Sequence, residues 1–274
     1  MYLDYWQLDA KPFEPGCDAQ SFYRGAAFQS AINKLRYAIE NRRAAGILAG
    51  PAGVGKTLLI ETLRQQLGEQ FHPLVRVVFP QMTERDLLVY LAEQLGAPPA
   101  DPPRHTIEES LRRLEYILAD NANRKRHAIV VVDEAHLLED SGLLEPLRLL
   151  LNLGPLGTPP FTLLLVGQPT LGPIVQRHGG LDERVDIKVL LPALAAKETA
   201  DYIAHRLDVA GASREIFAAD AMSAAYQLTG GIPRRINRLC DLALLVGFAN
   251  GQHTIDAESL HAIHGELVSV PVAA

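Results

Sequence analysis

Cysteine and long apolar runs are both scarce in this chain. Its 274 residues include two cysteines, Cys17 and Cys240, and neither belongs to a CxxC pair or a Cys/His cluster. Neither a disulfide framework nor a zinc site is therefore indicated, and a reducing, cytoplasmic location fits best. Apolar runs such as residues 129–132 are far shorter than the roughly 20 residues of a membrane helix. The opening stretch MYLDYWQLDAKPF also lacks the apolar core of a secretory signal, so we expect neither export nor a membrane span.

Positive charge is in deficit as well. The formal net charge is -6 and the sequence pI is about 5.8, which argues against a protein whose whole surface binds polyanions. A local basic patch on one part of the surface is compatible with these totals. Hydrophobic residues make up 48% of the chain, which is more than one compact core usually absorbs at this length. We therefore expect a main domain and a smaller one.

Apolar strands alternate with helical segments up to about residue 190. Strands are predicted at residues 45–49 and 74–79, within HAIVVVDEAH (127–136), and at residues 161–166 and 185–190, with capping boxes at Thr83 and Thr106 opening two of the helices between them. This alternation predicts an α/β fold with a parallel sheet flanked by helices. From about residue 195 only helices follow. The predicted organisation is an aromatic N-terminal segment (1–24), an α/β core (25–193) and a smaller all-helical lid (194–274).

A glycine-rich segment between the first strand and the next helix fits the pattern G-x-x-x-x-G-K-[ST]. Glycines let the backbone curl so that its N–H groups converge on phosphate oxygens, and the following helix points its positive end at the anion. Lys56 would reach the β and γ phosphates of ATP, and Thr57 would bind Mg²⁺. The predicted ATP-binding residues are Gly50, Pro51, Ala52, Gly53, Val54, Gly55, Lys56, Thr57 and Leu58.

The buried strand in HAIVVVDEAH delivers two carboxylates at its carboxyl end, the edge where parallel sheets bind their ligands. Asp133 suits the magnesium shell, and Glu134 suits orienting and activating the attacking water. The adjacent acid pair favours ATP hydrolysis over nucleotide kinase chemistry. His136 completes the string DEAH, but no second motor domain of the helicase kind is present, so we interpret it as a polar residue at a loop or helix start.

Four other side chains are candidates for the same site. Gln168 follows the strand 161–166 and could touch the γ-phosphate or the lytic water. Arg234 follows Gly-Ile-Pro at a positive helix start, where an arginine suggests an anionic neighbour. Arg184 could act across a subunit interface as an arginine finger, with Arg177 as the competing choice. A surface salt bridge is the alternative for either arginine.

Beyond single motifs, the sequence resembles the AAA+ ATPases, and among them the secretion-type ExeA/GspA-like group. The resemblance rests on YLDYWQLDAKPFEP, FYRG, GPAGVGKT, VVVDEAH, LLLVGQPTL, ETADYIAHRLDVAG and GGIPRRINRLCDLAL. It implies ATP, Mg²⁺ and nucleotide-dependent homo-oligomers, with Arg234 as sensor 2 and Arg184 as a finger. It also implies that Tyr23 lies near the adenine.

Two biological roles are open at this point. One is a soluble ATPase switch or motor that serves secretion or pilus-type assembly through a protein partner. The other is a transposition helper ATPase of the TniB/TnsC type, because the same core resembles that group. Its sequence support is a basic run, Arg124-Lys125-Arg126-His127, and the pair Arg112 and Arg113, which could bind double-stranded DNA or be ordinary solvated surface.

Overall fold

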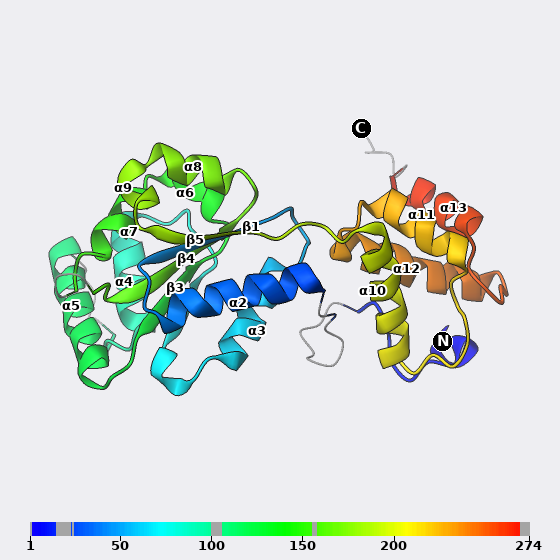
Figure 1. Cartoon of the computed structure of the whole chain (residues 1–274), viewed down its shortest axis with the longest axis horizontal. Helices are drawn as coiled ribbons and strands as arrows, with labels where there is room; N and C mark the ends of the chain where they lie inside the picture. The colour runs from blue at the N-terminus through cyan, green and yellow to red at the C-terminus, as the bar shows by residue number, and fades with distance from the viewer. Residues whose placement is uncertain (1, 15–22, 24, 100–105, 155–157, 269–274) are drawn as a thin grey trace. The chain divides into compact units, whose positions relative to one another are not determined.

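The computed structural model describes residues 2–14, 23, 25–99, 106–154 and 158–268, which form two compact units (Figure 1). The first, here called the sheet unit, comprises Ala27–Gly50 and Lys56–Leu191. The second, the helical unit, comprises Met1–Ala26, Pro51–Gly55 and Pro192–Ala274. This grouping places residues 2–14 of the aromatic N-terminal segment with the C-terminal helices.

The sheet unit is built on five parallel strands in the order β2-β3-β4-β1-β5. Their bounds are β1 (Ala45–Ala49), β2 (Leu74–Val77), β3 (Ala128–Val132), β4 (Phe161–Gly167) and β5 (Val185–Leu190). Every residue of β1, β3 and β4 is buried, as expected for central strands covered on both faces. All five predicted strands are therefore present, and the predicted parallel α/β fold is confirmed.

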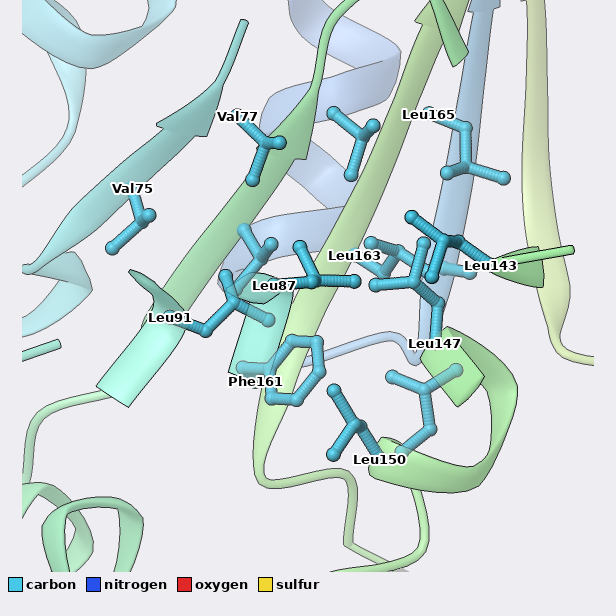
Figure 2. Close-up of a cluster of buried hydrophobic side chains, with 14 of the residues drawn as sticks. Val75, Val77, Leu87, Leu91, Leu143, Leu147, Leu150, Phe161, Leu163 and Leu165 are labelled. Carbon is cyan, nitrogen blue, oxygen red and sulfur yellow. The ribbon is translucent and has the colours of Figure 1, made fainter. Parts of the chain in front are cut away.

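Alternate residues of the strands face opposite sides of the sheet. Val75 and Val77 of β2 and Leu163 and Leu165 of β4 share one core with leucines of α4 (Glu84–Gln94) and α7 (Leu144–Leu150), as Figure 2 shows. On the other face, a side chain at Gly46 of β1 would come within 3.7 Å of Leu35, in α2 (Ala26–Glu40). The sheet is thus covered from both sides.

The remaining helices of this unit fill the connections between strands. Thr83 and Thr106 cap α4 and α5 (Ile107–Asn123) by accepting hydrogen bonds from the N–H groups of Asp86 and Glu109, as the capping pattern predicts. The other elements are α3 (Lys56–Gln66), η1 (Glu69–Phe71), η2 (Ala135–Leu137), α6 (Leu138–Ser141), α8 (Leu171–Arg177) and α9 (Gly179–Asp182).

The end of β2 differs from its prediction. We expected the strand to run to residue 79, but it ends at Val77, whose carbonyl accepts a hydrogen bond from the N–H of Asp133. The next two residues, Val78 and Phe79, are 62% and 65% exposed, and Pro80 has no N–H to continue a ladder. Their β-forming side chains made the predicted strand too long.

The helical unit has its own core. Its helices are α1 (Tyr2–Trp6), α10 (Ala196–Val209), α11 (Ala219–Thr229), α12 (Pro233–Ala249) and α13 (Ala257–Val268). Trp6 is fully buried, and its indole N–H donates to the carbonyl of Leu244 in α12 over 2.9 Å. Phe13 packs edge-on against Phe217 with ring centroids 6.1 Å apart. The aromatic N-terminus is therefore part of this core.

Candidate functional site

The glycine-rich segment leaves β1 and enters α3, as its pattern predicts. Gly50 begins it, and the Gly50 N–H donates to the carbonyl of Gly167 at the end of β4 over 3.1 Å. Gly53 and Gly55 have φ angles of 84° and 103°, in the left-handed region that only glycine adopts without strain. Lys56 is the first residue of α3, is 7% exposed, and donates from Nζ to the carbonyl of Gly50 over 2.8 Å.

This geometry is suited to an anion. The loop ends at a helix N-terminus, whose free N–H groups carry partial positive charge, and a buried lysine ammonium turns back along the loop. The other predicted ATP-binding residues fall where the motif places them. In exposure, Val54 is buried, Pro51 and Leu58 are half-buried, and Ala52 and Thr57 are exposed. Their contacts with ATP stay predictions.

The predicted magnesium ligands lie together. Thr57 Oγ1 in α3 is 3.3 Å from Oδ2 of Asp133, which directly follows β3. Asp133 is 6% exposed, and its other oxygen, Oδ1, accepts a hydrogen bond from the Glu134 N–H over 3.0 Å. A hydroxyl and a carboxylate are hard oxygen donors of the kind that Mg²⁺ prefers, so the pair fits that ion.

Sequence reasoning missed an arginine at this position. Arg76 of β2 donates from Nη2 to Oδ2 of Asp133 over 2.5 Å. The register explains the contact, because Arg76 pairs with Val131 on β3, and Val131 and Asp133 project from the same face of the sheet. The signal was a charged residue inside the otherwise apolar strand LVRV, next to a strand that ends in a carboxylate.

Glu134 has an unusual backbone. Its φ and ψ are 49° and 36°, a left-handed conformation that is uncommon for a residue with a side chain and that concentrates at functional sites. The side chain is 51% exposed, and Oε2 lies 3.5 Å from Nδ1 of His136. A side chain at Gly167 would come within 3.2 Å of the backbone nitrogen of His136. His136 therefore lies between the acid pair and the end of β4. Its contact with Glu134 goes beyond our interpretation of this residue as a polar group at a loop or helix start.

The other predicted residues of the sheet unit lie apart from this cluster or make local contacts. Gln168 is exposed directly after β4, at the edge that also carries the glycine-rich loop. Arg184 donates to Oδ1 of Asn152, and Arg177 forms an ion pair with Glu139 of α6. Both arginines thus have partners within the chain. A role across a subunit interface stays a prediction for either of them.

Besides the loop residues Pro51–Gly55, two predicted residues, Arg234 and Tyr23, belong to the helical unit. Arg234 follows Pro233 in the first turn of α12, is exposed, and forms no ion pair with any residue that the structure describes. Its N–H donates to the carbonyl of Gly53 over 3.2 Å, and a side chain at Gly53 would lie 2.8 Å from the Arg234 Cβ. Tyr23 packs edge-on against Tyr202, with ring centroids 5.9 Å apart. Its predicted place near adenine stays a prediction.

The basic run before β3 lies at the opposite edge of the sheet from the loop, because parallel strands begin at one edge and end at the other. One member of the run is paired within the chain, since Arg124 lies 3.0 Å from Asp120, and on α5 Arg112 pairs with Glu108 at 2.6 Å. The fourth member, His127, is 3% exposed. Treating it as part of a surface patch was wrong, because the chain enters the buried strand β3 at this point.

His127 is a candidate for acid sensitivity. Its Nε2 lies 2.9 Å from the Thr162 hydroxyl, which donates to the carbonyl of Arg43. Burial, and to a lesser degree the charge of Arg42, lower the pKa of His127 to about 4. The unfolded chain takes up this proton near pH 6.5, so the unfolded state binds more protons between the two values. The contribution of His127 to stability is therefore full above pH 6.5 and is lost as the pH falls toward 4.

We expect the free energy of unfolding, measured in urea, to fall by about 2 kcal/mol more between pH 7 and pH 5 in the unmodified protein than in His127→Gln. Glutamine keeps a polar partner for Thr162 but does not titrate. The exposed His253 supplies the control, since His253→Gln should leave the pH dependence as it is. Parallel pH profiles for the protein and His127→Gln would contradict the assignment.

No helix in the parts of the chain that the structure describes has both the length and the hydrophobicity that crossing a membrane requires.

Comparisons with known proteins agree with this architecture. General secretion pathway protein A of Aeromonas hydrophila is 32% identical over 271 residues, which cover 97% of this chain and 47% of that protein. This chain thus spans about half the length of that relative. Cdc6p of Pyrobaculum aerophilum has a similar fold, with a TM-score of 0.72 at 17% identity over 95% of this chain and 74% of that chain.

The ORC2 protein of Aeropyrum pernix, solved as ADPNP-ADP complexes, has a TM-score of 0.68 at 16% identity over 94% of this chain and 72% of that chain. At such identities the two structural matches support the fold alone. A family model described as AAA domain matches residues 39–175. Since this match spans half of the 274 residues and includes the loop, Asp133 and Glu134, the chain belongs to the AAA domain family.

Proposed function

We propose that this AAA protein binds ATP together with Mg²⁺, hydrolyses it to ADP and phosphate, and uses the cycle as a switch or motor. One observation carries the proposal: Thr57, at the start of the helix that follows the loop, lies 3.3 Å from the buried carboxylate of Asp133. Residues separated by 76 positions in the sequence thereby form the donor pair that an Mg²⁺–nucleotide complex requires.

The roles of the surrounding groups follow from their chemistry. The backbone N–H groups of the loop and the Lys56 ammonium would hold the phosphates, and Thr57 and Asp133 would hold the metal. A bound Mg²⁺ would supply charge stabilisation for phosphoryl transfer. Glu134, half exposed beside this pair, would orient the attacking water. Gln168, at the same edge of the sheet, would contact the γ-phosphate or that water.

In the helical unit, Arg234 is our candidate for the group that senses the nucleotide. Its exposed guanidinium has no carboxylate partner among the described residues, and its backbone bonds to the loop glycine Gly53. An arginine in the positive first turn of α12 is unfavourable unless an anion offsets the charge. Tyr23, in the same unit, would lie toward the adenine.

We infer a role in secretion or pilus-type assembly, as a nucleotide-dependent homo-oligomer with a protein partner. The support is the 32% identity to general secretion pathway protein A across 97% of this chain. The alternative, a DNA-bound transposition helper, has less support, because His127 is buried and Arg124 and Arg112 are ion-paired within the chain.

The test measures phosphate release and particle size with ATP and Mg²⁺, with and without double-stranded DNA, at two salt concentrations. We expect ATP hydrolysis, a size increase with nucleotide, and little response to DNA. Stimulation by DNA that falls steeply with salt would instead favour the transposition role, since counterion release makes such binding salt-dependent. A protein inert toward ATP and every other nucleoside triphosphate would refute the ATPase proposal.

A further inference from the structure

The guanidinium of Arg76 contacts the same oxygen of Asp133 that Mg²⁺ would use. Asp133 Oδ1 is engaged by the Glu134 N–H, which leaves Oδ2, the oxygen facing Thr57, as the metal-facing atom. That same Oδ2 accepts the 2.5 Å hydrogen bond from Arg76 Nη2. A guanidinium and a metal ion repel each other, so both cannot hold one carboxylate oxygen at full strength.

The arrangement has a physical cause. The carboxylate of Asp133 is 6% exposed, and burying it without a counter-charge is unfavourable. The Arg76 guanidinium can donate two parallel hydrogen bonds to a carboxylate and supplies that counter-charge. Arg76 is held by its backbone: it lies in the β2–β3 ladder, and its carbonyl accepts a hydrogen bond from the Tyr90 hydroxyl over 3.0 Å. Only its side chain, which is 38% exposed, is free to change position.

We propose that Arg76 is a built-in competitor for the metal site: it holds Asp133 until Mg²⁺ with nucleotide displaces it. This inference rests on the proposed function of the site and adds its regulation. Arg76 is a positioning residue in this account, because it acts on Asp133 rather than on the nucleotide. Displacing the Arg76 guanidinium lowers the apparent affinity for Mg²⁺. It also couples metal binding to a movement of this side chain on β2.

The test measures the affinity of a fluorescent ADP analogue across a series of free Mg²⁺ concentrations, which requires no turnover. In Arg76→Gln, the Mg²⁺ concentration at half-maximal enhancement of binding should fall about tenfold, as expected if the competing contact is about 90% populated in the unmodified protein. Arg76→Lys, which keeps a cation but loses the planar fork, should lie between the two.

The control is Arg112→Gln, an exposed arginine in an ion pair on α5, which should leave the midpoint unchanged. Thermal unfolding identifies any variant that fails to fold, and Arg76→Lys then carries the comparison. An unchanged or raised midpoint in Arg76→Gln overturns the competition. If the unmodified protein binds no analogue at any Mg²⁺ concentration, the proposed function itself fails.

Discussion

Replacing Lys56 with alanine should weaken ATP binding by about 100-fold or more, the usual cost of removing one member of a buried, hydrogen-bonded charge pair. Lys56 is 7% exposed, starts α3, and turns its ammonium back to the carbonyl of Gly50. No other described lysine combines burial with a place at a helix start that follows a glycine-rich loop. The change therefore removes the main positive side chain available to the phosphates.

Titration of the protein with a fluorescent ATP analogue in excess Mg²⁺ measures this loss. Lys34→Ala, at an exposed position on α2 of the same unit, is the matched control and should bind as the unmodified protein does. The far-ultraviolet circular dichroism of both variants shows whether the fold is kept. Unchanged affinity in a folded Lys56→Ala protein would show that the loop does not hold the phosphates.

Glu134→Gln should separate binding from turnover. The amide keeps the size and polarity of the side chain but cannot accept a proton, so hydrolysis should slow by about 10²- to 10⁴-fold while nucleotide affinity changes little. The backbone should tolerate the change, because the left-handed conformation depends on the main chain and neither residue is β-branched.

Single-turnover hydrolysis and equilibrium binding, measured on the same samples, check this expectation. Glu115→Gln, at an exposed position on α5, removes one carboxylate elsewhere and should leave both quantities unchanged. If Glu134→Gln keeps the original rate, another group activates the water. His136, 3.5 Å from Glu134, would then be the next residue to replace.

The local parts of the fold follow directly from the sequence. The loop between β1 and α3 is encoded in consecutive residues, and the N-caps Thr83 and Thr106 need only the residue three positions on, so all three appear where their patterns predict. The carboxyl-terminal placement of Asp133 follows from the parallel sheet, since all strands end at one edge.

The features that the sequence did not predict depend on contacts between distant segments. Arg76 meets Asp133 across 57 positions, in a register that no local pattern defines. His127 looks like the end of a basic run until β3 and Thr162, 35 positions away, bury it. Burial and strand register depend on the tertiary structure. A prediction from local sequence therefore places such residues at the surface.

One glycine restricts how this site can move. Gly167 accepts the N–H of Gly50, and its bare Cα lets His136 approach so closely that any side chain there would press on it. The Gly50 start of the loop, the β4 terminus and His136 therefore meet at Gly167, and a larger residue at this position should displace all three together.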